Sequence, residues 1–178
     1  KVNFTHNASI LTELEERGEA CVDPVGDLLA DLVRRAVQVK ADVVAVDFKE
    51  TGEGGGVGRA ALNYGHTFGH AIERVESYRW RHGAAISVGM VYVAELARLG
   101  GKLTEADVQR HRDLLQQLGL PTRYPGDRWD QLLSAMQVDK KARGSVLRFV
   151  ILNGLQNPVL WEGPDPALLH AAYGAVTA

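Results

Sequence analysis

The chain has 178 residues, 46% of them hydrophobic, and a formal net charge of −2, values that indicate a globular protein with a buried core. The near-balanced charge excludes an extended nucleic-acid-binding surface, and the longest apolar run, residues 84–99, is interrupted by Glu95 and Arg98, which excludes a membrane-spanning helix. With a single cysteine, Cys21, the chain has no internal disulfide to form, so we expect a reducing, cytoplasmic location.

Apolar spacing predicts two helices in the first third of the chain. We expect a short helix over residues 9–17 and a long one over 25–46, whose start is marked by Asp23 and Pro24. Lys40 lies on the apolar face of the long helix, where its stem can lie along the surface or its ammonium can reach an anionic substrate. The five glycines of 52–58 predict a loop, and their spacing does not favour a phosphate cradle.

The remaining elements are predicted to be helical apart from one hairpin. A helix over 60–78 leads through a turn to the apolar segment 84–99, which should be the central buried helix. Thr104 and Asp107 form a capping-box pattern that opens the next helix. The later elements are expected at 129–136 (helix), at 146–152 and 158–161 (paired strands) and after Pro166 (helix). Strands do not alternate with helices, so we predict a mainly α, multihelical domain with one small antiparallel β-hairpin.

Three of the six histidines lie close together in the sequence, at His66, His70 and His82. On a continuous helix His66 and His70 would share one face, with Glu73 one turn further on. The arrangement resembles the H-E-x-x-H zinc motif without its glutamate. Gly65 and Gly69 disfavour a helix by about 1 kcal/mol each, so they indicate close approach of backbone or ligand.

Two interpretations of the histidines remain open at this point, a metal or catalytic site and ordinary packing. The clustering favours a site, whereas the isolated His6, His111 and His170 are expected to be satisfied polar residues. On the helix predicted over 60–78, Arg59 and Asn63 would extend the stripe of His66 and His70. Lysines at 40, 140 and 141 add positive charge, so the set suits a metal and a polyoxygenated, anionic small molecule.

Several segments together resemble the 3-dehydroquinate synthases of the sugar-phosphate cyclase superfamily. They are KADVVAVD, ETG, GRAALNYGHTFGHAIE, WRHGAAISVGM, LGLP and DKKARGSVLRFVIL. The resemblance covers essentially the whole chain but only the C-terminal portion of the family's chain. It implies that residues 1–178 form the helical metal- and substrate-binding domain, and that the family's N-terminal NAD-binding domain is absent here. One departure is the insertion EGGGVG after Gly52, which affects the placement of Glu50.

The resemblance also implies roles for individual residues. His66 and His82 would bind a divalent metal, zinc or cobalt, and His70 would handle protons on the substrate side. Substrate carboxylate, hydroxyl or phosphate would be bound by Lys1, Lys40, Arg59, Asn63 and one of the pair Lys140 and Lys141. The family's third metal ligand, a glutamate, would lie three residues upstream of Lys1.

The activity implied is an NAD- and metal-dependent elimination of phosphate. The substrate would be 3-deoxy-D-arabino-heptulosonate 7-phosphate and the product 3-dehydroquinate, an intermediate of the shikimate pathway to chorismate and aromatic amino acids. The intact enzyme would be a cytoplasmic homodimer, and this chain alone, beginning at Lys1, is expected not to turn over. The alternatives are a related cyclase that makes an inosose or a valiolone, and a non-enzymatic helical domain with structural histidines.

Overall fold

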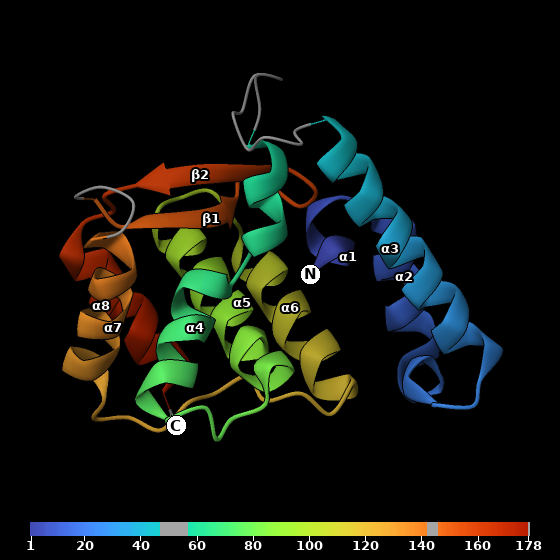
Figure 1. The fold of residues 1–178 in the computed structure, drawn as a ribbon, viewed down its shortest axis with the longest axis horizontal. Helices are drawn as coiled ribbons and strands as arrows, with labels where there is room; N and C mark the ends of the chain where they lie inside the picture. The colour runs from blue at the N-terminus through green and yellow to red at the C-terminus, as the bar shows by residue number, and fades with distance from the viewer. Residues whose placement is uncertain (47–56, 142–145, 178) are drawn as a thin grey trace.

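The computed structural model describes residues 1–46, 57–141 and 146–177, with side chains omitted at 139–141. Figure 1 shows a bundle of helices with a two-stranded hairpin lying across one end and two helices standing to one side. The bundle contains α4 (His66–Val75), α5 (His82–Leu99), α6 (Glu105–Gln117), α7 (Trp129–Lys141) and α8 (Pro166–Val176). The side helices are α2 (Ala8–Arg17) and α3 (Asp27–Val46), preceded by the short α1 (Val2–Thr5).

Helix α5 is the centre of the core. Every residue from Ala85 to Ala97 is buried, and the helix packs against α4, α6, α8 and the first strand. The ring of Phe68 stacks on that of Tyr92 with centroids 3.9 Å apart, and the Tyr92 hydroxyl donates to the Leu169 carbonyl. The prediction of a central buried helix is therefore confirmed, although α5 begins two residues earlier than expected.

The hairpin and the helix caps also follow the sequence prediction. Strands β1 (Arg148–Leu152) and β2 (Pro158–Glu162) pair antiparallel, from Arg148 opposite Glu162 to Leu152 opposite Pro158. Thr104 and Asp107 form the expected capping box of α6, and Asp165 caps α8 with Pro166 in its first turn. The mainly α fold class with one small hairpin is confirmed. No helix in the described ranges is long and apolar enough to cross a bilayer.

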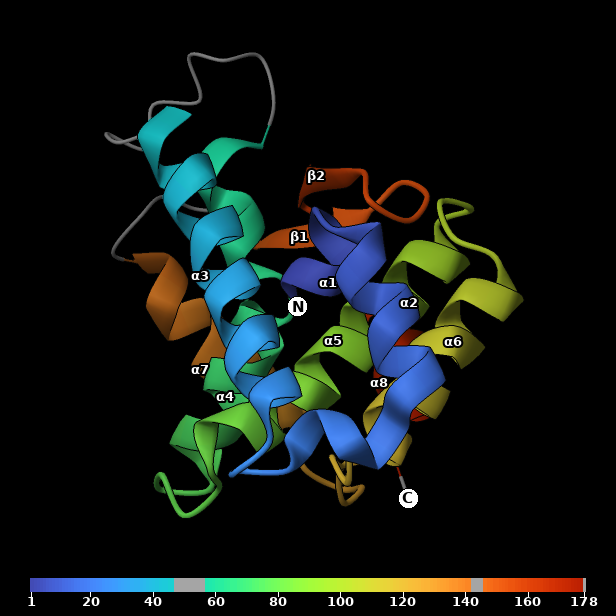
Figure 2. The same cartoon turned by 90° about the vertical axis from the view of Figure 1, so that its right-hand side faces the viewer.

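Helices α2 and α3 are attached to the bundle more lightly. They share a small separate cluster of Ile10, Cys21 and Leu32, with the 3-10 turn η1 (Gly18–Val22) between them. Charged pairs supplement this packing: Arg35 binds Glu13 across α2 and α3, and Arg110 of α6 binds Glu15 of α2. Figure 2 views the molecule from the side of these helices and shows α2 and α3 in front of the bundle.

Three of the predicted helices have wrong boundaries. Asp23 and Pro24 do not begin α3, because the Asp23 side chain accepts from the Val25 N–H and closes a turn before the helix starts at Asp27. The helix expected over 60–78 is also interrupted. A 3-10 segment η2 (Gly58–Asn63) ends at Tyr64, and Gly65 with φ +79° turns the chain before α4 begins at His66. Helix α7 extends five residues beyond the predicted end at 136.

Candidate metal and substrate site

The three clustered histidines meet where α4 and α5 begin. His66 is the first residue of α4, His70 lies one turn later, and His82 is the first residue of α5. Their ring centroids are 5.1 Å apart for His66 and His70, 5.5 Å for His66 and His82, and 5.9 Å for His70 and His82. The fold therefore brings all three rings together at one helix junction.

Glycines allow the two helices to come this close. A Cβ on Gly65 would lie 2.7 Å from the Met90 amide nitrogen, and one on Gly69 would lie 3.1 Å from the Ala85 carbonyl oxygen. Both positions lie against α5, so larger residues would push α4 away. The prediction of close backbone approach at these glycines is confirmed, but Gly65 precedes α4 and is not inside a helix.

Backbone contacts fix the orientation of the His66 ring. Its Nδ1 lies 3.2 Å from the Tyr64 carbonyl oxygen, which can only accept, so Nδ1 carries the proton. Its Nε2 then has a free lone pair, and Lys1 Nζ donates to it across 3.1 Å. Burial, with a further contribution from the Lys1 charge, lowers the pKa of His66 to about 4. His66 is thus a neutral imidazole near pH 7, the form that binds metals.

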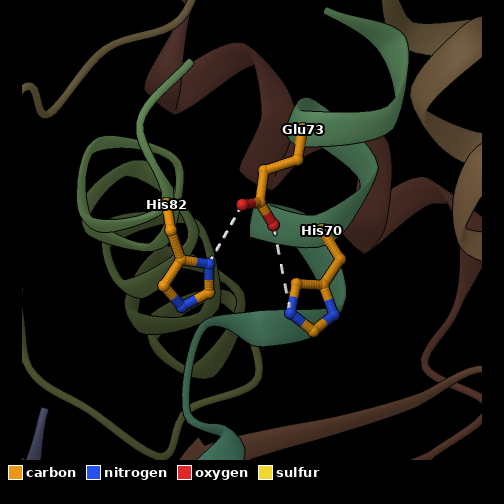
Figure 3. Close-up of side chains that lie close together, drawn as sticks. All are labelled: His70, Glu73 and His82. Atoms are coloured by element: carbon orange, nitrogen blue, oxygen red, sulfur yellow. Dashed lines mark hydrogen bonds and ion pairs between the residues drawn. The ribbon is translucent and has the colours of Figure 1, made fainter. Parts of the chain in front are cut away.

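His82 and His70 share a carboxylate. The His82 Nδ1 lies 3.0 Å from one oxygen of Glu73, and His70 Nε2 lies 4.0 Å from the other. Figure 3 shows Glu73 above and between the two rings, with His70 and Glu73 on α4 and His82 at the start of α5. The ligand atoms of these three residues lie within 4.8 Å of one another. His82 and Glu73 could not be paired from the sequence, because the turn that joins α4 to α5 sets their distance.

A cleft of about 530 Å³ opens around Lys1, the residue that contacts His66. Its lining contains four of the polar residues predicted to bind substrate, namely Lys1, Lys40, Arg59 and Asn63, together with apolar residues of α1, α3 and η2. The pKa of the Lys1 side chain is lowered, first by burial and then by the charge of Lys40. Because Lys1 also contacts His66, it joins the positively charged cleft to the histidine cluster.

The predicted stripe of Arg59, Asn63, His66 and His70 along one helix is wrong. The turn at Tyr64 and Gly65 separates the four residues into two groups. Arg59 and Asn63 lie in the 3-10 segment and line the cleft, whereas the two histidines lie on α4. Lys140 and Lys141 are in the last turn of α7, with side chains outside the described part of the chain, as is Glu50 entirely.

A fourth histidine, predicted to be a satisfied polar residue outside the site, is buried and linked to the cluster. His111 is 0% exposed and stacks on Phe4. Its Nδ1 donates to the Asp107 carbonyl across 2.8 Å, so its Nε2 accepts from the Tyr64 hydroxyl across 3.1 Å. His111 therefore anchors the residue whose carbonyl orients His66. His6 bonds Thr5 and the ring of His170 lies against Trp129, as expected of residues outside the site.

The imidazole nitrogens of His66 and His82 are ligand atoms of the kind that a zinc or cobalt ion requires. His66 and His82 each engage Nδ1 with a protein acceptor, which leaves Nε2 as the ligand atom. Neutral imidazoles suit both metals. The chain's own side chains therefore fit the metal that the motifs imply.

Comparisons with known proteins agree with the motifs. Residues 1–142 match the family described as 3-dehydroquinate synthase C-terminal. A 3-dehydroquinate synthase of Nocardia farcinica is 56% identical over 176 residues, which are 99% of this chain and 46% of that protein. One from Saccharopolyspora erythraea is 54% identical over 177 residues, with 99% and 46% covered. The chain thus spans about half the length of the curated relatives it matches.

Solved structures show the same fold at lower identity. ValA, the 2-epi-5-epi-valiolone synthase of Streptomyces hygroscopicus subsp. jinggangensis 5008 with NAD+ and Zn2+ bound, has a TM-score of 0.83 and 23% identity, over 97% of this chain and 47% of that one. A 2-deoxy-scyllo-inosose synthase complexed with carbaglucose-6-phosphate, NAD+ and Co2+ has a TM-score of 0.72 and 22% identity, over 94% and 51%.

Proposed function

Because the chain belongs to the 3-dehydroquinate synthase family, we propose that it supplies the metal- and substrate-binding part of that enzyme. The reaction converts 3-deoxy-D-arabino-heptulosonate 7-phosphate to 3-dehydroquinate and phosphate. The observation that carries the proposal is the junction of a histidine cluster with a cleft lined by Lys1, Lys40 and Arg59. This arrangement suits a substrate that has hydroxyls for a metal and two anionic groups for cations.

In this proposal the metal is zinc or cobalt, and His66 and His82 are its ligands within this chain. Relatives with the same fold are described with NAD+ and with Zn2+ or Co2+, which supports the choice of both cofactors. When bound, the metal polarises a substrate hydroxyl and NAD supplies a reversible hydride acceptor. NAD would be held mainly by a domain in the half of the relatives' length that this chain does not span, and the intact enzyme would be a cytoplasmic homodimer.

The cleft residues orient the substrate. Lys1, Lys40 and Arg59 would bind its carboxylate and phosphate, and the Asn63 amide would bind a ring hydroxyl. One of the lysines at 140 and 141 would add a further charge. Holding both anionic ends fixes the reacting carbon, and such orientation supplies much of the rate in an elimination.

His70 is proposed to move the proton. It shares Glu73 with His82 but does not engage its Nδ1 as the two proposed ligands do. Its side chain is 53% exposed, so it is accessible to a substrate. A histidine side chain can accept a proton and return it. The proposed role is proton transfer beside the departing phosphate.

A related cyclase that makes an inosose or a valiolone is less well supported. Relatives that exceed 50% identity are described as 3-dehydroquinate synthases, whereas the two cyclases of other specificity share only 22–23% identity and show the fold alone.

Product analysis of the complete protein that contains this chain tests the function. Incubated with the heptulosonate phosphate, NAD+ and Zn2+ or Co2+, it should release phosphate and 3-dehydroquinate in equal amounts, and a chelator should stop both. Sedoheptulose 7-phosphate and glucose 6-phosphate serve as competing substrates. A carbocycle formed from either of them, with none from the heptulosonate, would refute the proposal in favour of another cyclase.

A further inference from the structure

We propose that Glu73 is a positioning residue that holds His82 in the Nδ1–H tautomer and so directs the His82 Nε2 into the metal site. The inference rests on the proposed function only in taking His82 as a metal ligand. It adds to the site a carboxylate that acts through a histidine.

The geometry of the contact favours this role. The Glu73 side chain is 12% exposed, whereas that of His82 is 58% exposed. The carboxylate is therefore the fixed partner of the pair, and the ring is the partner that would rotate without it. At 3.0 Å from His82 Nδ1, the carboxylate can only accept, so the ring nitrogen must donate. A ring held in this way is more basic at Nε2 and binds metal more tightly.

His66 shows the same arrangement with a different acceptor. Its Nδ1 donates to the Tyr64 backbone carbonyl, so both proposed ligands have Nδ1 bound to a protein acceptor. The His66 Nε2 accepts from Lys1 Nζ in this structure. The carbonyl is fixed by the turn before α4 and cannot be deleted by substitution. Glu73 accepts the corresponding hydrogen bond from His82 with its side chain, so its contribution can be measured by substitution.

Glu73 could instead be a metal ligand, since its oxygens lie within 4.8 Å of ligand atoms on His70 and His82. Its Oε1 already accepts from His82 Nδ1, and its Oε2 faces His70, as Figure 3 shows. Both oxygens thus face rings of the cluster. A carboxylate in this position orients the two histidines and leaves their opposite edges for metal and substrate.

The first test is the tautomer of His82 in the metal-free 178-residue chain, read from its imidazole 15N shifts above about pH 8, where histidines are neutral. The wild-type ring should be protonated at Nδ1. Glu73→Ala should give a mixture of tautomers, and Glu73→Gln, whose amide oxygen still accepts, should retain most of the Nδ1–H form. Glu76→Gln is the matched control, because Glu76 lies on the same helix end but accepts from Tyr124. An unchanged tautomer in Glu73→Ala would overturn the proposal.

The second test is a double-mutant cycle on Co2+ affinity, followed by its visible spectrum. Glu73→Ala should weaken binding by about tenfold to a hundredfold, and Glu73→Gln by less. In a His82→Gln background the same substitution should have no further effect, because Glu73 acts through His82. A loss of equal size in that background would show direct ligation and overturn the proposal. Unchanged affinity in His82→Gln alone would instead refute the proposed metal site, a failure that the tautomer measurement distinguishes.

Discussion

The two sides of the candidate site are built differently. The histidines stand on α4 and α5, and α5 is buried from Ala85 to Ala97. Lys40 stands on α3, where Leu32 is the buried residue and Val33 and Val37 are 53% and 60% exposed. A metal needs ligands fixed to a fraction of an ångström, and the histidine side provides a rigid core for them. The cation side, which is α3 with Lys40, has fewer buried contacts, so α3 should unfold locally more easily.

The contacts between elements explain this difference. On the histidine side, α4 lies so close to α5 that Gly89 has no room for a side chain beside the Gly65 carbonyl. On the cation side, α3 relies on a three-residue cluster and on partly exposed ion pairs such as Arg35 with Glu13 of α2, which stabilise little. A rigid histidine side and a weakly anchored cation side predict different responses to substitution.

The largest effect should come from filling the contact between α4 and α5. In Gly89→Ala the new Cβ would overlap with the Gly65 carbonyl oxygen, and the free energy of unfolding should fall by about 3 kcal/mol or more. Gly83→Ala, on the same helix with nothing within 4 Å of its Cβ position, should be neutral or stabilising by up to about 1 kcal/mol. Equal urea midpoints for the two variants would contradict the rigid contact.

The next effect is on stability in acid, and it comes from the buried His111 beside the histidine cluster. Burial lowers the pKa of His111 from 6.5 to about 4, so between these values the unfolded chain binds a proton that the folded chain does not. The contribution of His111 to the free energy of unfolding is complete above about pH 6.5. Up to about 3 kcal/mol is lost as the pH falls toward 4. His111→Gln should reduce the pH dependence of urea unfolding from pH 4.5 to 7.5, with the contribution of His66 remaining, while the exposed control His170→Gln should keep the full dependence. An unchanged slope in His111→Gln would contradict the assignment.

Weakening the packing of α3 should allow this helix to unfold locally without unfolding the bundle. Leu32→Ala removes the α3 member of the small cluster and should destabilise α3 by about 2 kcal/mol. Hydrogen exchange should accelerate in α3 and remain slow in α5. If both helices lost protection equally, the two sides would belong to one cooperative unit and the contrast would be wrong.

The smallest effect concerns binding alone. Lys40→Met keeps the apolar stem of a residue that lines the cleft, so stability should change by less than about 0.5 kcal/mol. Loss of one charged contact to an anionic substrate should lower kcat/KM of the complete enzyme by about tenfold or more. Arg34→Met is the control, because Arg34 is on the same helix and pairs with Asp31. Equal losses for the two variants would count against Lys40 as a substrate contact.

Local sequence signals predicted most of the fold, because the elements are specified by near neighbours. The capping box at Thr104 and the apolar run of α5 are examples. The break at Gly65 was missed because the sequence does not distinguish a glycine with positive φ before a helix from a glycine inside a helix. Its cause is the contact with Gly89, twenty-four residues later.

The site was predicted less completely. Spacing alone suggested His66 and His70 as a pair, and the family motif was needed to propose His66 with His82. Two contacts had no local signal. Lys1 contacts His66 across sixty-five positions of sequence. Glu73 contacts His82 because a turn, in which Ser77 and Tyr78 have positive φ, brings the start of α5 back to α4.

Metal titration of three single variants tests the central assignment most directly. Co2+ affinity should fall by at least about a hundredfold in His66→Ala and in His82→Ala, whereas His70→Ala should bind Co2+ as the wild type does. Loss of affinity in His70→Ala together with full affinity in His66→Ala would contradict the assignment and place the metal between His70, Glu73 and His82.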